Sequence, residues 1–379
     1  MGCEVTIDDI CSSVCSGGTP QKSNSEYYEN GNIPWLNTKE ISFNRIRKTK
    51  QFITEAGLRQ SSAKWVRANS VVVAMYGATA GKVAITKIPL TTNQACCNLE
   101  VDKEVADYRY IYYWFQNQYS RVLNLANGGA QQNLNAKTIK AMEIKLPNLA
   151  LQQRIANCLS AIDDEIELNI ELNGYLEKLV SLEFSRRFKA STPTIELGKV
   201  LSISTESIKP QEHAGEIWEH YSIPAYDENR QPLFELSDGI KSNKYAIDAN
   251  CILISKLNPA TKRIWMPSCT SEHSVCSTEF IVYKPKNPRY KSFYYAAIDS
   301  QAFTDFLIAH VTGSTGSRQR TQPKATLTYP MPNPGHDAIE GFCAFADPIY
   351  KQIQSNKLES KWLVSLRDAL LPKLMSGEI

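Results

Sequence analysis

Residues 155–180 read IANCLSAIDDEIELNIELNGYLEKLV, and this stretch decides the fold because its apolar positions recur at alternating steps of four and three. Such heptad spacing predicts a long helix that buries one narrow face against a second helix. The positions that form this face are Ile155, Leu159, Ile162, Ile166, Asn169, Asn173, Leu176 and Val180. The alternative is an ordinary amphipathic helix that packs on its own domain.

A second seam with the same spacing follows later in the chain. Its positions are Ile339, Phe342, Ala346, Ile349, Ile353, Asn356, Ser360, Leu363, Arg367 and Leu370. Two such helices most simply bury each other as an antiparallel pair, whose asparagines fix the register at a cost in stability. Asp347-Pro348 interrupts the second seam. Because Asp favours the N-cap and Pro the first helical position, we expect a break or kink there.

The remaining sequence repeats one plan. KAMEIKLPN at 140–148 and ATLTYPMPN at 325–333 end in the same Pro-Asn, 185 residues apart. ANSVVVAMYG at 68–77 resembles DANCILISKL at 248–257, and LVSL recurs at 179–182 and 363–366. The common order and nearly constant offset predict a tandem repeat of half-chains.

The predicted fold class is therefore α+β, with two α/β domains in a pseudo-two-fold tandem repeat separated by an antiparallel coiled coil of two long helices. The expected boundaries are residues 1–148 and 192–333 for the domains, and 149–191 and 334–379 for the helices. Residues 71–75 and 251–254 are short apolar runs typical of buried strands. The aromatic segments 108–125 and 290–310 have helical spacing, and we expect them to pack in the core rather than to stack on bases.

The composition places the chain among ordinary globular proteins. Its 379 residues suit about two to three domains. No stretch is long and apolar enough to span a membrane, and the first residues do not resemble a signal peptide. The ten cysteines include no C-x-x-C pair, which argues against a disulfide scaffold and a zinc ribbon. We therefore expect a reducing, cytoplasmic location.

The positive charge is concentrated in the first domain, although the net charge is only +3. Residues 1–148 contain 17 Lys and Arg against 12 Asp and Glu. Within them, residues 39–67 contain Glu40 and Glu55 as their acids and the following bases: Lys39, Arg45, Arg47, Lys48, Lys50, Arg59, Lys64 and Arg67. This run predicts a surface that follows DNA phosphates. The alternative is a solvated face without a partner.

Residues 77–83, GATAGKV, approach a phosphate-binding loop but have one residue too few between the glycines and a Val after the Lys. We predict instead a Gly-rich turn between two strands, whose amides and Lys82 can still contact a DNA phosphate.

Two polar loops occupy matching places in the half-chains, namely NGGAQQN at 127–133 and TGSTGSRQR at 312–320. Glycine lets the backbone approach a ligand, Gln and Asn pair with adenine, and Arg pairs with guanine. These loops are candidate base readers, and flexible connectors are the alternative.

The sequence offers no catalytic constellation. All five histidines lie in the second half without metal-ligand spacing, and no Asn-Pro continues into the Pro-aromatic loop of adenine methyltransferases. Glu359-Ser-Lys361 resembles the end of a nuclease metal site, but it lies in the second seam without partner acids. We therefore predict a non-catalytic chain. The alternatives are a stand-alone nuclease or methyltransferase, and an interaction scaffold that does not bind DNA.

Several segments resemble the specificity (S) subunit of type I restriction–modification systems. SGGTPQKSNSEYYENGNIPWLNTKEIS at 16–42, YGATAGKVAI at 76–85 and NQACCNL at 93–99 resemble the opening block of that family. Residues 146–184 are similar to its central helix, and LLPKLMSGEI at 370–379 is similar to its C-terminal end. The second recognition block resembles the family weakly, and His336-Asp337-Ala338 stands where the family has a Gln-rich helix start.

The resemblance implies two target-recognition domains that each read half of a bipartite target in double-stranded DNA. Two modification subunits would bind the chain and methylate adenine with S-adenosylmethionine, and restriction subunits would add ATP- and Mg-dependent translocation and cleavage. No cofactor is expected in this chain. The candidate DNA-binding residues are Thr19, Lys39, Arg45, Arg47, Lys48, Gly77, Thr79, Lys82, Gln131, Gln132, Asn133, Lys256, Lys262, Arg263, Arg318, Gln319 and Arg320.

Overall fold

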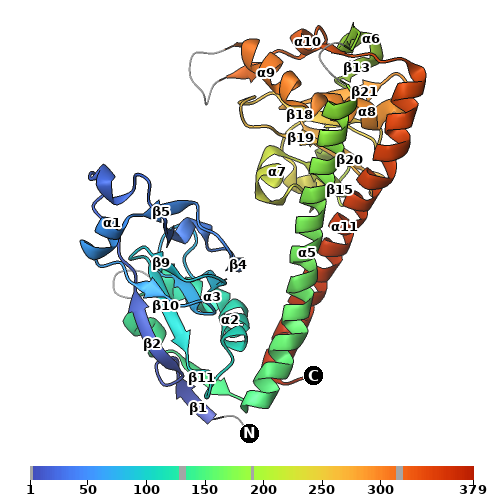
Figure 1. Ribbon diagram of the computed structural model, residues 1–379. Helices are drawn as coiled ribbons and strands as arrows, with labels where there is room; N and C mark the ends of the chain where they lie inside the picture. Colours follow the sequence, from blue (N-terminus) through green and yellow to red (C-terminus); the bar gives the residue numbers. More distant parts are fainter. Residues whose placement is uncertain (1–2, 128–133, 189–191, 313–318) are drawn as a thin grey trace. The chain divides into compact units, whose positions relative to one another are not determined.

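The computed structural model describes residues 3–127, 134–188, 192–312 and 319–379 (Figure 1). The chain divides into two compact units, of which unit 1 comprises Met1–Ile166 and Trp362–Ile379 and unit 2 comprises Glu167–Lys361. Among the described residues, no helix combines the length and the apolar character that a membrane span needs. All ten cysteines are free thiols.

Unit 1 is built on two sheets and a smaller strand pair. The five-stranded sheet has the order β2 (Cys11–Ser16), β10 (Cys96–Val101), β7 (Val71–Ala74), β8 (Val83–Thr86) and β4 (Asn44–Ile46). The four-stranded sheet has the order β5 (Gln51–Ile53), β3 (Ile33–Leu36), β9 (Leu90–Thr92) and β6 (Trp65–Val66). β1 (Cys3–Thr6) pairs with β11 (Glu143–Leu146). The helices are α1 (Glu55–Arg59), α2 (Tyr108–Asn117), α3 (Tyr119–Asn127) and α4 (Ala136–Lys140).

The central strand β7 explains the layering of unit 1. Val71 and Val73 pack in one core with the buried residues of α2 and α3. Val72 and Ala74 pack on the opposite face with residues of the four-stranded sheet. A strand buried on both faces reads as a continuous apolar run, and this burial produced the signal at residues 71–75. The order of layers is helices, five-stranded sheet, four-stranded sheet (Figure 1).

The aromatic segment of unit 1 packs in the core, as predicted. Residues 110–115 of α2 are all buried, with Trp114 the most exposed at 8%. Tyr112 packs edge-on against Tyr113, and Trp114 packs edge-on against Phe115. These rings are therefore committed to packing and are not available to stack on bases.

Unit 2 also contains two sheets and smaller strand pairs. One sheet has the order β13 (Leu201–Ser204), β21 (Phe280–Pro285), β18 (Ile252–Ser255) and β19 (Ile264–Trp265). The other has the order β14 (Ser207–Ile208), β17 (Lys244–Ala246), β20 (Ser274–Ser277), β15 (Ile217–Tyr221) and β16 (Leu233–Leu236). The pairs are β12 (Thr194–Glu196) with β24 (Pro330–Pro332), and β22 (Val311–Thr312) with β23 (Arg320–Thr321). The helices are α6 (Leu197–Val200), α7 (Ile223–Asn229), α8 (Lys291–Ile298), α9 (Gln301–Ala309) and α10 (Pro323–Thr326).

The strand pairing of unit 2 repeats that of unit 1. β15 runs parallel to β20 as β3 runs parallel to β9. β16 and β5 pair antiparallel with the first of these strands, and β17 and β6 pair antiparallel with the second. Unit 2 adds β14 and has no counterpart of β4 among its described residues. The topology thus confirms the internal repeat that the weak sequence matches predicted.

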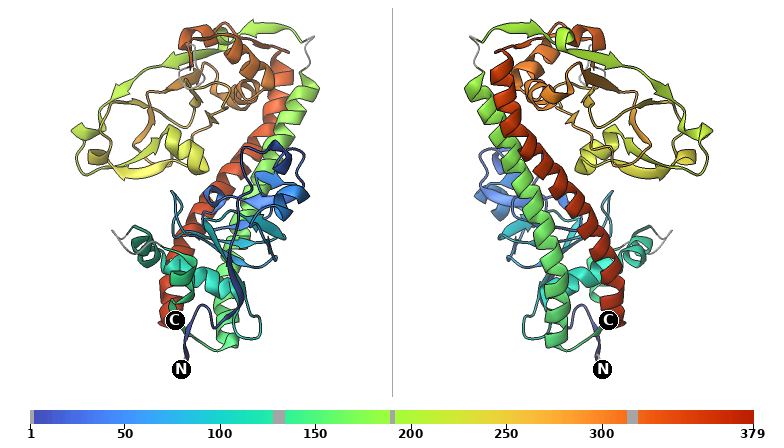
Figure 2. Two further views of the ribbon diagram at one scale, coloured as in Figure 1. Left: turned by 90° about the vertical axis from the view of Figure 1, so that its left-hand side faces the viewer. Right: turned by 90° about the vertical axis from the view of Figure 1, so that its right-hand side faces the viewer.

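The two seams form the long helices α5 (Leu149–Arg187) and α11 (His336–Ser376). Every predicted seam residue is buried or partly buried. Within unit 2, Asn356 Nδ2 donates to Asn173 Oδ1 at 2.9 Å, and Asn169 Nδ2 donates to Glu359 Oε2 at 3.2 Å. The partner number on α11 falls as the number on α5 rises, so the helices of this unit lie side by side and antiparallel (Figure 2).

Of the break or kink expected at Asp347-Pro348, the break is wrong, because α11 continues through both residues. Proline removes one backbone donor, which leaves the carbonyl of Ala344 without its helical partner. Ala344 and Pro348 are both exposed, so water can bond to this carbonyl. The adjacent Ala346 is fully buried in the core of unit 2, and this packing holds the helix together.

Candidate nucleic-acid interface

Two loops of unit 1 meet and carry several predicted DNA-binding residues. One connection leads from β3 through the 3-10 turn η2 (Thr38–Glu40) and the short strand β4 to β5, and the other joins β7 to β8. Thr79 Oγ1 donates to the carbonyl of Thr38 at 2.8 Å, and Lys82 Nζ lies 3.5 Å from Ser42 Oγ. These contacts join residues 37–50 and 76–82 into one surface, which we call the loop surface.

The second loop is a hairpin turn, as predicted, since β7 and β8 pair antiparallel on either side of it. Gly77 has φ +90° and Gly81 has φ +78°, a region that favours glycine. A Cβ on Gly77 would meet nothing within 4 Å, whereas a Cβ on Gly81 would lie 3.2 Å from the backbone nitrogen of Leu123 on α3. Gly77 therefore leaves the backbone open to a phosphate, and Gly81 allows close packing.

The lysines of the loop surface lack carboxylate partners. Lys39 and Lys48 are exposed and Lys82 is half-buried. Within the described parts of the chain, none of the three forms an ion pair within 4 Å. Lys82 Nζ lies 6.0 Å from the ring centroid of Phe43, and Arg47 is exposed on the same loop.

Arg45 differs from its neighbours, although the sequence placed it in the same basic run. Its side chain is 6% exposed, pairs with Asp164 on α5, and donates from Nη2 to the carbonyl of Ser160 at 3.2 Å. It therefore attaches β4 to α5 and presents little charge to a ligand. Thr19 lies outside the loop surface, where its hydroxyl donates to the side chain of Gln94.

The predicted cations between β18 and β19 of unit 2 are bound to acids. Arg263 donates to both carboxylate oxygens of Asp227, at 2.6 and 2.9 Å. Lys262 Nζ lies 2.7 Å from Asp299 Oδ1. Burial raises the pKa of Asp299, and the charge of Lys262 opposes that shift. Sequence reasoning missed these partners because they lie far along the chain from the cations.

Lys256, Gln319 and Arg320 meet at the base of the β22–β23 hairpin. The carbonyls of Gln319 and Lys256 accept backbone hydrogen bonds of 3.0 and 2.8 Å that join the two segments. Arg320 Nη2 lies 3.3 Å from Glu279 Oε1. Lys256 Nζ donates to the carbonyl of Thr278 at 2.6 Å, and burial lowers the pKa of Lys256. Gln131, Gln132, Asn133 and Arg318 lie outside the described residues.

A row of apolar side chains on α5, which the sequence analysis overlooked, is exposed in unit 2. We call it the outer stripe, and its residues are Leu168, Leu172, Tyr175, Leu179 and Leu182, between 39% and 63% exposed. Their spacing of four, three, four and three residues is a second heptad seam beside the buried one. Contiguous exposed apolar rows are typical of interaction surfaces.

Comparison with known proteins shows what the sequence and the fold resemble. Residues 3–178 match the family described as Type I restriction modification DNA specificity domain. The MjaIX specificity subunit of Methanocaldococcus jannaschii is 25% identical over 411 aligned positions, which cover 98% of this chain and 92% of that protein. The EcoR124I/EcoR124II specificity subunit of Escherichia coli is 32% identical over 152 residues, 39% of this chain and 37% of that protein.

A solved structure shows the same fold over nearly the whole chain. The S subunit of a type I restriction–modification system from M. genitalium aligns with a TM-score of 0.60 and 18% identity, covering 98% of this chain and 95% of that chain. The relatives are named as specificity subunits, in agreement with the predicted non-catalytic chain. The predicted resemblance to the specificity subunits of type I restriction–modification systems is thus confirmed: residues 3–178 match their DNA specificity domain, and the fold is similar over nearly the whole chain.

Proposed function

We propose that the chain binds a bipartite target in double-stranded DNA and positions modification subunits on it. The observation that carries this proposal is the loop surface, where Lys39, Lys48 and Lys82 have no carboxylate partner among the described residues. Cations of this kind neutralise phosphates and release counterions, which supplies much of the affinity for DNA. The loop surface therefore supports backbone contacts that position unit 1 on the duplex.

The repeated topology supports a two-part target, with one half-site for each unit. The turn between β7 and β8 corresponds to the segment between β18 and β19, so both units offer loops at the same place in the fold. In unit 2, Gln319 and Arg320 flank the hairpin loop, and Arg can pair with the edge of a guanine. Each unit would thus read its own base pairs through its own loops.

Modification subunits would dock on the outer stripe of α5. Burying such a stripe against a partner helix recovers the hydrophobic free energy that the unpartnered chain forgoes. Methyl transfer from S-adenosylmethionine would take place on these partners. ATP and Mg would act on restriction subunits. This chain would supply binding and orientation, and it would operate in the cytoplasm.

Reconstitution with the modification subunit of the same system tests the function. The purified chain alone should show neither methyl transfer with S-adenosylmethionine nor DNA cleavage with magnesium. Adding the modification subunit should produce methylation at one bipartite sequence, which sequencing of methylated bases would reveal. Turnover by the chain alone that survives repurification would support a stand-alone enzyme, and absence of salt-dependent DNA binding would support a DNA-free scaffold.

The docking surface is tested by Leu172→Ser combined with Leu179→Ser. Both side chains are exposed, so the substitution should leave folding and DNA binding intact while it prevents co-elution with the modification subunit. Lys178→Ser is the matched control, since Lys178 is an exposed residue of the same helix outside the stripe. Unchanged co-elution of the double variant would show that the partner binds elsewhere.

A further inference from the structure

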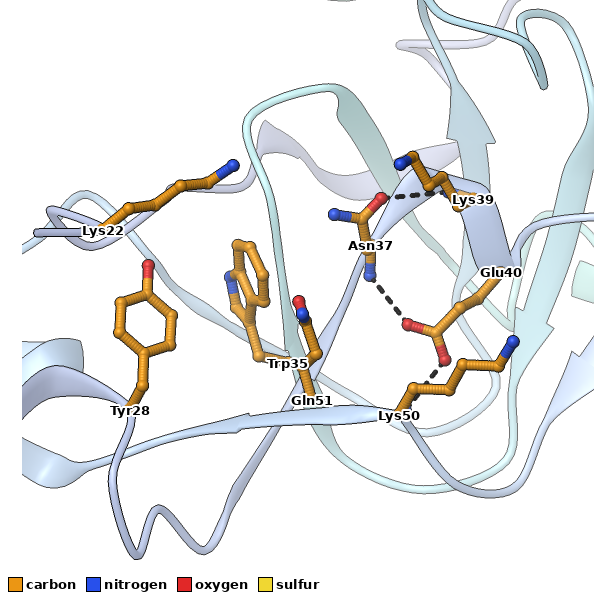
Figure 3. Close-up of a pocket in the computed structure, with 8 residues that line it drawn as sticks. All are labelled: Lys22, Tyr28, Trp35, Asn37, Lys39, Glu40, Lys50 and Gln51. Carbon is orange, nitrogen blue, oxygen red and sulfur yellow. Dashed lines mark hydrogen bonds between the residues drawn. The ribbon is translucent and has the colours of Figure 1, made fainter. Parts of the chain in front are cut away.

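A hollow of about 560 Å³ opens in unit 1 and shares Asn37, Lys39, Glu40 and Lys50 with the loop surface, but contacts with phosphates of paired DNA do not require its depth or its aromatic residues. Its volume falls within the usual range for small-molecule sites, about 300–1,000 Å³. The residues that line it are Lys22, Tyr28, Trp35, Asn37, Lys39, Glu40, Lys50 and Gln51 (Figure 3). They come from the segment that precedes β3, from β3, from η2 and the residue before it, and from the start of β5 and the residue before it.

The aromatic wall of the hollow is fixed in place. Trp35 is 2% exposed, and its Nε1 donates to the carbonyl of Gly18 at 2.9 Å. Tyr28 packs edge-on against Trp35 with 6.1 Å between ring centroids, and its hydroxyl donates to the carbonyl of Pro20 at 2.6 Å. Tyr28 is only half-buried, so part of its ring remains available to a planar ligand.

Glu40 lies on the opposite side of the hollow, where backbone donors hold its carboxylate in place. Its Oε1 accepts from the backbone nitrogen of Asn37 at 3.2 Å, and its Oε2 accepts from that of Lys50 at 2.9 Å. The side-chain oxygen of Asn37 accepts from the backbone nitrogen of Lys39 at 3.1 Å. Among the described residues the amide nitrogen of Asn37 has no acceptor, and Figure 3 shows it pointing into the hollow, where Gln51 lies next to Trp35.

The rim of the hollow is cationic. Lys22, Lys39 and Lys50 are exposed, and within the described parts of the chain none has a carboxylate partner within 4 Å. The lining thus combines three ammonium groups, one carboxylate occupied by backbone donors, two amides and an aromatic wall. This combination fits an anion that carries a flat, hydrogen-bonding ring.

A nucleotide has this chemistry, and the concave shape of the hollow indicates that its base must lie outside the double helix. Bases inside a duplex are read by protein elements that enter a groove, whereas a hollow receives a base only after it has left the stack. We propose that the hollow binds one extrahelical nucleotide, with its base on Tyr28, its edge against Asn37 and Gln51, and its phosphate near the lysines. This inference rests on the proposed DNA-binding function.

Binding of the full chain to two matched duplexes tests the proposal. One duplex carries 2-aminopurine as a single-nucleotide bulge, and the other carries it paired with thymine in the same sequence. We expect the bulged duplex to bind about 10-fold more tightly, the scale of one base–aromatic stack, and its fluorescence to be quenched on binding. Equal affinities would overturn the hollow as a nucleotide site and leave the function standing, whereas no binding to either duplex would overturn the function.

Variants of the aromatic wall locate the effect. Tyr28→Leu should abolish the preference for the bulge and leave the affinity for paired DNA within about 2-fold. Tyr28→Phe keeps the ring and should keep the preference. Phe52→Ala is the matched control, because Phe52 is 41% exposed beside Gln51 but does not line the hollow. A preference that survives Tyr28→Leu would contradict the proposal.

If Tyr28→Leu does not fold, variants of two exposed lysines test the proposal instead. Lys22→Ala combined with Lys50→Ala changes two exposed side chains and should not affect folding. The pair should weaken binding of the bulged duplex more than binding of the paired duplex, because both ammonium groups lie at the rim. Equal losses on the two duplexes would show that these lysines contact ordinary backbone phosphates, and the proposal would fall.

Discussion

Units 1 and 2 share most of their strand pairing but differ in how their cations are arranged. In unit 1, Lys39, Lys48 and Lys82 have no ion-pair partner among the described residues. In unit 2, Arg263 is bound to Asp227, and Lys262 is bound to Asp299. The two units therefore repeat an arrangement of strands but not the distribution of unpaired cations on their surfaces. We expect unit 1 to supply most of the affinity for phosphates and unit 2 to contribute more through shape and hydrogen bonds.

The helix pair shows a second contrast between the units. In unit 1, Arg367 Nη1 donates to Asp163 Oδ1 at 2.9 Å, and the hydroxyl of Tyr113 donates to Asp163 Oδ2 at 2.6 Å. In unit 2, the matching interior contact joins the amides of Asn356 and Asn173. A buried charge pair and a buried amide pair both fix helix register, but they respond very differently to the loss of one partner.

We expect the substitution of Asp163 to have the greatest effect on stability, and it compares the charge pair of unit 1 with the amide pair of unit 2. Asp163→Ala leaves the Arg367 guanidinium, 15% exposed, with only the exposed Asp368 as a carboxylate partner and leaves the Tyr113 hydroxyl without an acceptor. We expect a loss of about 3 kcal/mol in the free energy of unfolding. Asn173→Ala should cost only about 1 kcal/mol, because a neutral amide is left behind. Chemical denaturation of both variants measures the difference, and equal losses would contradict it.

Removing charge from the loop surface should affect DNA binding next most strongly. Each lost phosphate contact reduces the slope of log affinity against log salt by about 0.9. The triple variant Lys39→Ala, Lys48→Ala and Lys82→Ala should therefore lower affinity on the order of 100-fold at about 150 mM salt. The matched control in unit 2 is Lys262→Ala with Arg263→Ala, whose cations already have carboxylate partners. A loss in the control as large as in the triple variant would show that both units bind phosphates alike.

Substitution of Arg320 tests whether unit 2 reads a base of its half-site. It lies at the end of the polar loop of unit 2, 57% exposed and 3.3 Å from Glu279. If it reads a guanine edge, Arg320→Ala should cost about 1–3 kcal/mol of discrimination and relax one half-site only. Mapping of methylated bases in the reconstituted complex shows which half-site changes. An unaltered motif together with unaltered affinity would identify the loop as a connector.

The parts of the fold that sequence could predict are those set by local periodicity. The seam of α5 is visible because burial recurs along one helix face, and residues 71–75 are visible because β7 is buried on both sides. The continuity of α11 was not predictable from Asp347-Pro348, because it depends on the packing of Ala346 in the folded unit.

The site was predictable only as a list of residue types. Arg45 and Lys48 look alike in sequence, but Arg45 reaches Asp164 on a helix more than a hundred residues later, and Lys48 does not. Ion pairing of this kind is a property of the fold and leaves no local signal. The hollow was equally invisible, since Tyr28, Asn37 and Gln51 converge only when β3 and β5 pair.

We expect a smaller effect on the pH dependence of stability. It distinguishes strand β15 of unit 2 from the corresponding strand β3 of unit 1. β3 contains no titratable side chain, whereas β15 carries His220, whose Nδ1 lies 2.6 Å from Glu235 Oε1. Burial lowers the pKa of His220, although Glu235 opposes the shift. The pKa of His220 is therefore lower in the folded chain than in the unfolded chain, where it has the usual histidine value of about 6.5. As the pH falls below about 6.5, the unfolded chain binds the proton more readily, so the stability of unit 2 decreases. His220→Gln should remove this dependence in denaturation curves, and a stability that rises as the pH falls would show that the Glu235 contact outweighs burial.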